Sequence, residues 1–586
     1  MIKASIYFNG DDCFLTWKMP KLTDCRGFAI HLKKERNGKT IFDGFIDNRT
    51  GFEGDDNPPN SKKSSEEWPF QRYSWTDHGV YEGDTVTYSI YPVIYSAENL
   101  KTDMSEGVTV GPVEVSPAGA GKASAYFNRG LIISQFMGKY MFKNYGKEWG
   151  TKELTEMKNS LKNDDSELRK FLMGELGEKL FTLLAQAKDK GWHIYAALYE
   201  LDDPDIVDCL ISLGKKAHLV LSNGSVKKKG EDGNKKAVAK LGNKIDLNRR
   251  MLWSEGLGHN KFVVFAKSPT EPVMVWTGST NWATTGLCTQ LNNGILVEDK
   301  NIAKTYFEQW KLLKNDKRTG RGGRTDMHFG EKLMESNDEM KSGNAGKTGK
   351  WNVWFTRTSN QQDIEYATEL INGAKEAILF LMFEPGNAGL LPVIQARLSP
   401  ASKFYDENLY VHGVVNTLKA EGKDKKVNVE LVGRGENKPF DLRLVQPEGI
   451  KGGFHGWIEE VTRSEFLMSV KDPETQKMGV IGHAIIHTKA IVIDPFTNPT
   501  VITGSHNFSL SASSKNDENI IIIKNNPELA QRYCVNIMSA YQHYRWRAYL
   551  KNCLENGIEP WQGLKKSDDW QNTDVDKDKE IAFWVR

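Results

Sequence analysis

The segment HTKAIVIDPFTNPTVITGSHN, residues 487–507, places a histidine and a lysine at the start of an apolar run. His487 and Lys489 are two residues apart, so on a β-strand their side chains lie on the same face. Asp494 is seven residues from His487, and on a regular strand it points to the opposite face. This spacing favours a supporting role for Asp494 over a direct catalytic one. A second apolar run follows and ends in three small or polar residues, Gly504, Ser505 and Asn507.

An earlier segment, HNKFVVFAKSPTEPVMVWTGSTN at residues 259–281, has nearly the same arrangement. The expected strands and helices around the two segments also follow one order. Both halves place a glutamate at the end of their first expected strand, Glu200 in LYELDD and Glu384 in MFEPG. A similarity with so long a period predicts an internal duplication that forms two similar domains, not a solenoid of short repeats.

These residue types are suited to chemistry at a phosphate. A lysine neutralises the phosphate charge, and an asparagine amide or a serine hydroxyl forms hydrogen bonds with its oxygens. A histidine attacks phosphorus or protonates the leaving oxygen. A two-step displacement needs a nucleophile on one side and an acid on the other. Two copies that face each other supply both, so the duplication predicts one shared active site.

The two motifs resemble the signature of the phospholipase D superfamily, which is His-x-Lys, then Asp, then Gly-Ser-x-Asn. Glu518, in the segment KNDENI, stands eleven residues beyond Asn507 and corresponds to the acidic residue that orients the catalytic histidine in the family. The second copy matches at every signature position: His487, Lys489, Asp494, Gly504, Ser505 and Asn507.

The first copy departs from the signature at two positions. Ala266 stands where the family has Asp, and Asn292 stands where it has the acidic residue. The halves are therefore expected to be chemically unequal. The sequence leaves open what orients His259, since Glu200 or Glu384 is a candidate to orient a histidine of the opposite half. The remaining positions match: His259, Lys261, Gly278, Ser279 and Asn281.

The resemblance implies an α/β fold in which two pseudo-symmetric α/β/α domains share one site. It implies a phosphodiesterase that needs no metal or other cofactor, because two lysines supply the charge that a metal provides elsewhere. By family habit His259 is the nucleophile that forms a phosphohistidine and His487 is the acid, although the residues alone accept the reverse. The predicted catalytic residues are His259, Lys261, His487, Lys489, Glu518 and Asp494, and the predicted substrate-binding residues are Ser279, Asn281, Ser505 and Asn507.

The N-terminal residues 1–116 read as short alternating strands separated by turn-rich stretches, which predicts an antiparallel β-sandwich. Trp17 and Tyr88 resemble the core tryptophan and corner tyrosine of fibronectin type III domains. Nothing in this region suggests catalysis, so we expect it to bind or position a partner, such as another protein. The remaining predicted parts are a first half at 120–315, a linker rich in glycine and charge at 316–350, and a second half at 351–586.

The motif leaves the substrate open, since the superfamily acts on nucleic acids, on phospholipids and on some protein–DNA adducts. The insertion at residues 223–250 holds nine Lys and Arg against three Asp and Glu, and it precedes the first motif. It suits nucleic acid, although an anionic membrane surface or a solvated loop accounts for it equally. The residues after the second motif resemble those of the nuclease branch of the superfamily, so nucleic acid is the leading predicted substrate and phospholipid is the alternative. A duplicated but inactive binding module is the weakest alternative.

Whole-chain properties add little to this prediction. The 586 residues carry a formal net charge of +2, so charge alone identifies no partner. The six cysteines have no zinc-site spacing and predict reduced thiols. The start of the chain shows no secretory signal, which predicts a cytoplasmic protein, although a specialised secretion route leaves no such signal. Both catalytic halves lie in one chain, which is compatible with a monomer.

Overall fold

The computed structural model of the chain describes residues 2–55, 61–116, 123–130, 140, 143–145, 151–163, 165–225, 231–252, 256–319, 325–327, 330–344, 349–386, 388–421, 424–435, 438–445, 485–556, 563–572 and 575–586. The described part divides into two compact units. The first comprises Met1–Pro117, Gly433–Arg443 and Tyr541–Arg586, and the second comprises Ala118–Val432 and Leu444–Ala540.

The N-terminal region is all β, as predicted. Trp17 and Tyr88 are fully buried in one core cluster, and the Tyr88 hydroxyl donates a hydrogen bond to Asp77 at 2.8 Å. The resemblance to fibronectin type III domains stays a prediction. One antiparallel sheet has the order β1 (Lys3–Phe8), β2 (Cys13–Lys18) and β7 (Ser74–Asp77). The other has the order β10 (Val108–Glu114), β8 (Asp84–Ser96), β3 (Cys25–Arg36) and β4 (Lys39–Phe45); β9 (Asn99–Thr102) pairs with β8, and β5 (Asp47–Asn48) pairs with β6 (Lys63–Ser64).

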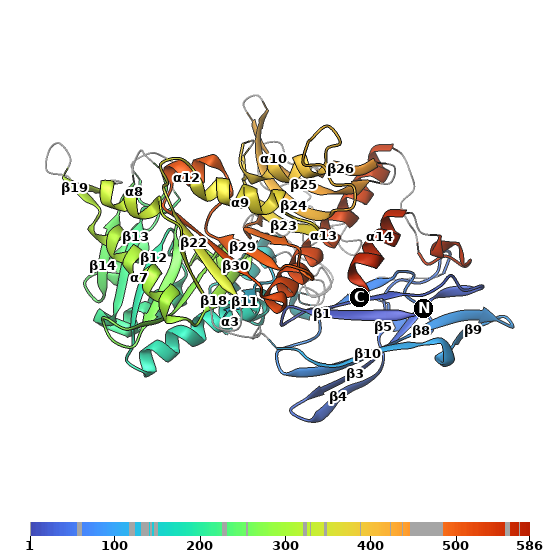
Figure 1. The fold of residues 1–586 in the computed structure, drawn as a ribbon. Helices are drawn as coiled ribbons and strands as arrows, with labels where there is room; N and C mark the ends of the chain where they lie inside the picture. The colour runs from blue at the N-terminus through green and yellow to red at the C-terminus, as the bar shows by residue number, and fades with distance from the viewer. Residues whose placement is uncertain are drawn as a thin grey trace. The chain divides into compact units, whose positions relative to one another are not determined.

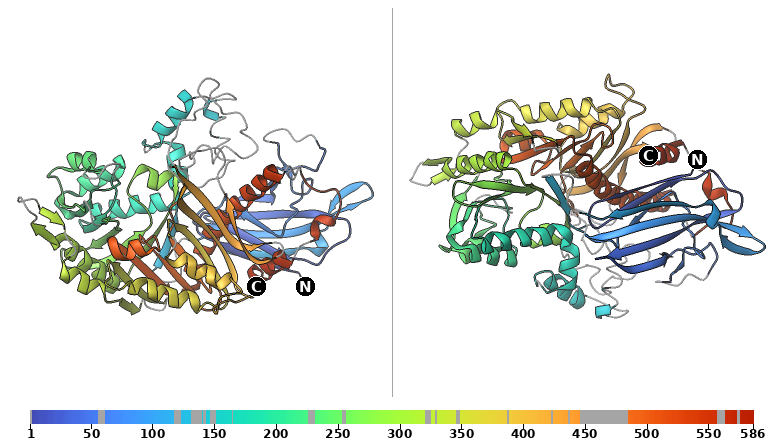
Figure 2. Two further views of the ribbon diagram at one scale, coloured as in Figure 1. Left: turned by 90° about the horizontal axis from the view of Figure 1, so that it is seen from above. Right: turned by 60° about the horizontal axis from the view of Figure 1, so that its bottom comes forward.

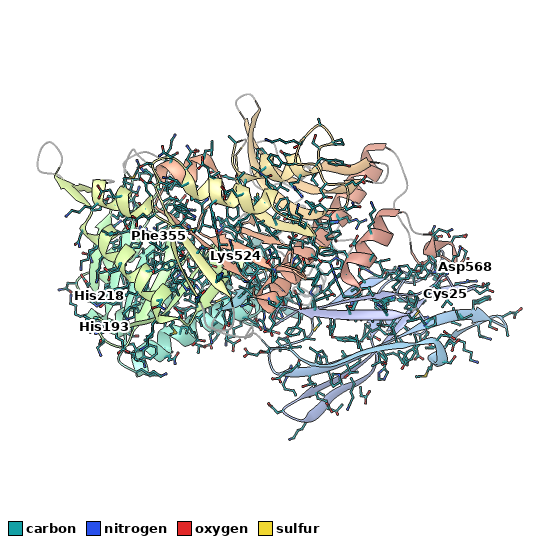
Figure 3. All side chains as sticks on the ribbon, in the orientation of Figure 1. Cys25, His193, His218, Phe355, Lys524 and Asp568 are labelled. Carbon is teal, nitrogen blue, oxygen red and sulfur yellow. The ribbon has the colours of Figure 1, made fainter. Side chains whose placement is uncertain are left out.

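The C-terminal segment packs on these N-terminal sheets. The ring of Trp584, in α14 (Val575–Trp584), lies edge-on to Phe14 with 5.0 Å between centroids. Trp570 donates a hydrogen bond from Nε1 to the carbonyl of Cys25 at 2.9 Å, and Figure 3 labels Cys25 beside Asp568. The segment Tyr541–Arg586 thus belongs to the first compact unit, and these aromatic rings pack in it, while the domain bounds stay a prediction.

The second unit contains two sheets in which corresponding strands occur in the same order (Figure 1). In the first sheet the order is β11 (Ala123–Phe127), β18 (Asn293–Val297), β16 (Pro272–Gly278), β15 (Lys261–Ala266), β12 (His193–Leu198), β13 (Ala217–Ser222) and β14 (Asp246–Arg250). The second sheet includes, in order, β21 (Lys341–Asn344), β22 (Lys350–Thr356), β30 (Glu518–Lys524), β29 (Thr500–Gly504), β28 (Ala490–Ile493), β23 (Ala377–Phe383), β24 (Tyr410–Glu421) and β25 (Asp424–Gly435). This correspondence is the structural form of the predicted duplication.

Helices cover both faces of the first sheet (Figure 2). Tyr195 of β12 packs against Phe307 and Trp310 of α7 (Lys300–Asn315), with 4.6 and 4.9 Å between ring centroids. Its neighbours Ile194 and Ala196 face the other way, into a core that includes leucines of α3 (Glu167–Asp189). Burial on both faces explains why these strands are continuous apolar runs. The other helices are α2 (Thr151–Ser160), α4 (Pro204–Leu213), α5 (Lys235–Leu241), α6 (Thr284–Cys288), α8 (Glu331–Asn337), α9 (Gln362–Asn372), α10 (Leu390–Leu398), α12 (Leu510–Lys515) and α13 (Pro527–Asn556).

The predicted linker at 316–350 contains regular structure. Its described residues form β19 (Lys317–Thr319), β20 (Thr325–Met327), α8 and β21. Strand β21 pairs with β22 and is the edge strand of the second sheet. Glycine and charge at an exposed sheet edge resemble linker composition, which explains the difference from the prediction.

Within the described ranges, no helix combines the length and the apolar character that crossing a membrane requires.

Candidate active site

His259 lies just before β15 and is held by the other half of the duplicated unit. Its backbone N–H donates to the carbonyl of Asp517 at 2.9 Å. Its ring Nδ1 lies 2.8 Å from both carboxylate oxygens of Glu518, the first residue of β30. The prediction that Glu518 orients a histidine is therefore refined, because the histidine it contacts belongs to the first motif.

His487 has the mirror arrangement. Its backbone N–H donates to the carbonyl of Leu291 at 2.9 Å, and its Nδ1 lies 2.8 Å from Oδ1 of Asn292. The amide of Asn292 has a defined orientation, because Nδ2 donates to the carbonyl of Gly286 at 2.9 Å and Oδ1 accepts from the Ser279 hydroxyl at 2.7 Å. Asn292 thus stands where Glu518 stands in the other half, and it offers His487 a neutral oxygen.

The partners assign the protonation of both imidazoles. A carboxylate and an amide oxygen are hydrogen-bond acceptors, so Nδ1 of His259 and of His487 each carries the proton. This leaves Nε2 of each ring with a lone pair in the neutral form. The two rings differ in the charge beside Nδ1, which is negative for His259 and neutral for His487.

Each motif lysine folds back on its own histidine. Lys261 donates from Nζ to the carbonyl of His259 at 2.8 Å, and Lys489 donates to the carbonyl of His487 at 2.6 Å. Lys261 is 1% exposed and Lys489 is 0% exposed. Both ammonium groups are thus held at the motif histidines and shielded from solvent.

An aromatic ring covers each histidine–lysine pair, and neither motif includes this ring. The Tyr199 ring lies 4.7 Å from His259 and 5.1 Å from Nζ of Lys261. In the other half the Phe383 ring lies 5.0 Å from His487 and 4.9 Å from Nζ of Lys489. Each ring immediately precedes the strand-end glutamate of its half, and this shared position was the available sequence signal.

Burial dominates the electrostatics of the site. It lowers the pKa of His259 to about 4, although Glu518 acts in the opposite direction. Burial, followed by Lys489 and Lys261, lowers the pKa of His487 well below its ordinary value. Burial also lowers the pKa of Lys261 to about 7 and that of Lys489 well below the usual range. An arriving phosphate therefore restores charge to lysines that the protein holds largely desolvated.

The strand-end glutamates lie in this electrostatic field. Oε2 of Glu200 accepts a hydrogen bond from Nδ2 of Asn281 at 2.6 Å. Burial raises the pKa of the Glu200 carboxyl, and the positive charge of Lys261 opposes that shift. Burial lowers the pKa of Lys489, and the negative charge of Glu384 opposes that shift. The carboxylates thus flank the site, but Glu518 and Asn292 occupy the positions that orient the histidines.

The motif serines are structural in this arrangement. Both are fully buried, and the Ser279 and Ser505 hydroxyls accept backbone N–H groups of Asn293 and Asn519, each at 3.0 Å. They fix the starts of β18 and β30, where Asn292 immediately precedes β18 and Glu518 is the first residue of β30. Both hydroxyls thus position neighbouring backbone, and their contact with substrate stays a prediction, as it does for the half-buried Asn507.

Asp494 lies at the far end of β28 from His487. Its carboxylate accepts backbone N–H groups of Lys375, Glu376 and Ala377 at 2.7 to 3.0 Å. This side chain therefore anchors a loop to the strand end, which agrees in kind with the supporting role that its spacing favours, and its catalytic assignment stays a prediction. Ala266, at the end of β15, leaves the first half without that anchor but removes nothing from the histidines.

Further contacts connect the halves behind the histidines. Arg250 forms a buried ion pair with Asp517, next to Glu518. Asn293 donates to the Tyr533 hydroxyl at 2.8 Å, and the Tyr306 hydroxyl donates to Asn519 at 3.1 Å. Because these contacts depend on residues far apart in the chain, no local pattern indicated them.

The basic insertion at 223–250 is partly neutralised. Arg249 pairs with Asp232 at 2.9 Å, in addition to the pairing of Arg250 with Asp517. The lysines at 227–229 lie outside the described residues. Within the described part, no group of three or more His, Cys, Asp or Glu side chains is arranged to hold a metal ion.

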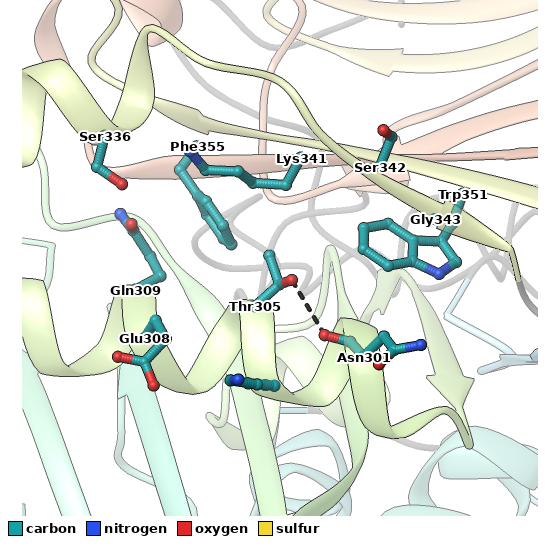
Figure 4. A pocket seen from close by; sticks show the side chains of 11 residues that line it. Asn301, Thr305, Glu308, Gln309, Ser336, Lys341, Ser342, Gly343, Trp351 and Phe355 are labelled. Carbon is teal, nitrogen blue, oxygen red and sulfur yellow. Dashed lines mark hydrogen bonds between the residues drawn. The ribbon is translucent and has the colours of Figure 1, made fainter.

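A cavity of about 350 Å³ lies elsewhere in the same unit, between α7 and strands β21 and β22 (Figure 4). Its lining includes Lys304, Glu308, Trp351 and Phe355, and none of its lining residues belongs to either motif. The buried histidine and lysine pairs, and not this cavity, carry groups suited to phosphoryl chemistry.

Comparisons with known proteins agree with the motif. Residues 404–539 match the family model described as cardiolipin synthase, PLD-like domain. No curated protein sequence matches the chain.

Solved structures with local similarity include Nuc from Salmonella typhimurium, at 19% identity and a TM-score of 0.20, covering 25% of this chain and 91% of that one. Phosphatidylserine synthase from Haemophilus influenzae is 8% identical with a TM-score of 0.33, covering 68% and 90%. Yeast tyrosyl-DNA phosphodiesterase is 11% identical with a TM-score of 0.27, covering 58% and 86%. All three TM-scores are below 0.5, so these similarities do not decide what this chain acts on. The match at 404–539 therefore shows that this region of the chain is similar to the PLD-like domain of the cardiolipin synthase type.

Proposed function

We propose that this protein is a phosphodiesterase that acts through a covalent phosphohistidine without a metal ion, and that its substrate is a nucleic acid. The observation that carries the proposal is the crossed pairing of His259 with Glu518 and of His487 with Asn292. It places two imidazoles with the same tautomer and different basicity in one buried site.

The difference between the partners supports His259 as the nucleophile. Attack by Nε2 on phosphorus leaves a positive charge on the ring, and the carboxylate of Glu518 stabilises that charge. The bond from phosphorus to the leaving oxygen breaks as the new P–N bond forms. The lowered pKa keeps His487 neutral in the empty site, and the negative charge of a bound phosphodiester favours uptake of a proton from water on Nε2. The resulting cation lies beside only a neutral amide, so it delivers this proton to the leaving oxygen.

The second step runs with His487 as base. Its Nε2, now neutral, takes a proton from water while the water oxygen bonds to phosphorus and the P–N bond breaks. His259 is thereby restored, and the phosphoryl group leaves with the new oxygen. Lys261 and Lys489 stabilise the charge that develops on the phosphoryl oxygens in both steps. Asn281 and Asn507 are proposed to donate from Nδ2 to those oxygens.

The substrate class rests on weaker observations. The residues after the second motif resemble the nuclease branch, and the insertion at 223–250 keeps exposed Lys235 and Lys236 near the first motif in sequence. Such cations attract a polyanionic backbone. Phospholipid is the second candidate, because the matching family model is named for cardiolipin synthase.

A side-by-side hydrolysis assay in excess EDTA tests the proposal. The substrates are single- and double-stranded DNA, RNA, and vesicles of phosphatidylcholine and phosphatidylglycerol. His259→Ala and His487→Ala are the test variants. His193→Ala is the matched control, because His193 lies at the opposite end of β12 from Tyr199 and contacts His218 at 3.0 Å (Figure 3).

Nucleic-acid cleavage that survives EDTA and vanishes in both test variants is expected. Release of lipid headgroups with the same pattern would move the protein to the second candidate. Full activity in either test variant, or activity that EDTA abolishes, would refute the mechanism. The intermediate is tested separately by quenching with labelled substrate, since a phosphohistidine survives alkali and is lost in acid. Label should be absent from His259→Ala.

A further inference from the structure

The carboxyl group of Glu200 is hydrogen-bonded to the side-chain amide of Asn281, which is the amide proposed above to bind a phosphate oxygen. Its Oε2 lies 2.6 Å from Nδ2 of Asn281, the donor proposed above for a phosphoryl oxygen. Asn281 is 5% exposed, and among the described residues its Oδ1 has no hydrogen-bond partner. Glu200 itself is half-buried. A carboxylate in this position resembles a bound anion.

The backbone holds this contact in place. Leu201 and Trp282 form a parallel β-bridge, and Asp202 accepts the backbone N–H of Thr284 at 3.0 Å. Arg169 is fully buried and pairs with Asp203 at 2.9 Å. These contacts hold the residues after Glu200 beside the residues after Asn281. The Glu200 carboxyl group is therefore preorganised next to the Asn281 amide.

The charges around the site make this position consequential. Burial raises the pKa of Glu200 and the positive charge of Lys261 opposes that shift, so the carboxyl is ionised in alkaline solution. The carboxylate of Glu518 is already bonded to His259. A phosphodiester carries one negative charge, whereas a phosphomonoester carries close to two at neutral pH. The additional charge of a monoester is repelled by the carboxylate of Glu200 in a site that water screens poorly.

We propose that Glu200 is a specificity-determining residue that admits monoanionic phosphodiesters and rejects dianionic phosphomonoesters. This inference rests on the proposed function, because it takes the site to bind phosphate. Substrate binding displaces the carboxylate oxygen from Asn281 Nδ2, which then donates to a phosphoryl oxygen. A monoester end, such as a cleaved product terminus, is held less tightly and is released.

The test compares dimethyl phosphate with methyl phosphate at pH 8, because these probes differ by one methyl group and one charge. Binding to the full chain is measured by calorimetry for the wild type, Glu200→Gln, Glu200→Asp and Glu178→Gln. Glu178 is exposed on α3, so its variant makes the same change of charge outside the site. Thermal unfolding of each variant checks that it is folded.

Glu200→Gln is expected to raise the affinity for methyl phosphate about tenfold more than the affinity for dimethyl phosphate. Glu200→Asp and Glu178→Gln are expected to keep the wild-type preference. Equal changes for the two probes, or no change, would overturn the inference while leaving a phosphate site intact. Failure of both probes to bind any folded variant would overturn the proposed phosphate site and this inference together.

Discussion

Replacing Glu518 by glutamine removes a negative charge from Nδ1 of His259 while nearly preserving the side-chain shape. Both carboxylate oxygens lie 2.8 Å from that nitrogen, and Glu518 is 0% exposed. Burial raises the pKa of Glu518, but His259 and Lys261 outweigh it, so the net pKa is lowered and the group is ionised. The variant therefore removes a negative charge whose attraction to the His259 ring is strongest when that ring becomes positive.

The magnitude follows from the geometry. Two opposite charges about 4 Å apart attract by ~4 kcal/mol at an effective dielectric of about 20. The glutamine retains a neutral hydrogen bond worth about 1 kcal/mol, so a loss of about 2–3 kcal/mol is expected. This corresponds to a phosphorylation step slowed by about 30- to 150-fold.

The assay is rapid quench with bis(p-nitrophenyl) phosphate under single-turnover conditions. It follows both p-nitrophenolate release and covalent label on the protein. Asn516→Ala is the matched control, because Asn516 donates to Glu518 at 3.1 Å without adding charge at His259. A Glu518→Gln rate within about threefold of wild type would refute the role of the carboxylate in stabilising a positive His259. An equal loss in Asn516→Ala would assign the effect to packing.

Four further predictions use the same site and its supports. Asn292→Asp places a negative charge beside His487 and raises the pKa of that ring, which makes it a weaker acid. Release of alkoxide leaving groups should slow by about tenfold, while release of p-nitrophenolate changes little, and rates for a series of leaving groups measure this. Asp494→Ala leaves three backbone N–H groups without their acceptor, so the free energy of unfolding in urea should fall by at least about 2 kcal/mol with kcat/KM nearly unchanged. Arg250→Met leaves the buried carboxylate of Asp517 without its ion-pair partner, so the free energy of unfolding in urea should fall by about 3–5 kcal/mol. An unchanged free energy of unfolding would contradict this. The His259 pKa of about 4 lies below its ordinary value of about 6.5, so the unfolded chain takes up a proton on this ring first as pH falls from about 6.5 to about 4. Over this pH range the wild type should lose up to about 3 kcal/mol of its free energy of unfolding relative to His259→Gln. Parallel pH profiles of stability for the two proteins would contradict this.

Much of the candidate site was predictable from local patterns. The spacing of His487 and Lys489, repeated at His259 and Lys261, predicts that each pair lies together, since two residues along a strand share a face. The alternating strands of residues 1–116 likewise predicted an all-β region. These inferences succeed because strand periodicity and motif spacing are properties of adjacent residues.

Partners distant in the chain were decided by the tertiary structure. Glu518 reaches His259 across 259 positions and Asn292 reaches His487 across 195, so the orienting residue of each half serves the histidine of the other. The hydrogen bond from the Ser279 hydroxyl to Asn292 likewise depends on the folded chain, because the two residues are 13 positions apart and lie on different segments.

The sequence by itself determined the candidate site residues, the duplication that brings two sets of them, and the apolar runs that become strands. Only the tertiary structure decided which histidine receives a charged partner and where the C-terminal aromatic residues pack. The physical reason is that hydrogen bonds and burial depend on which surfaces meet in space. Those surfaces are contributed by segments whose separation along the chain carries no periodic signal.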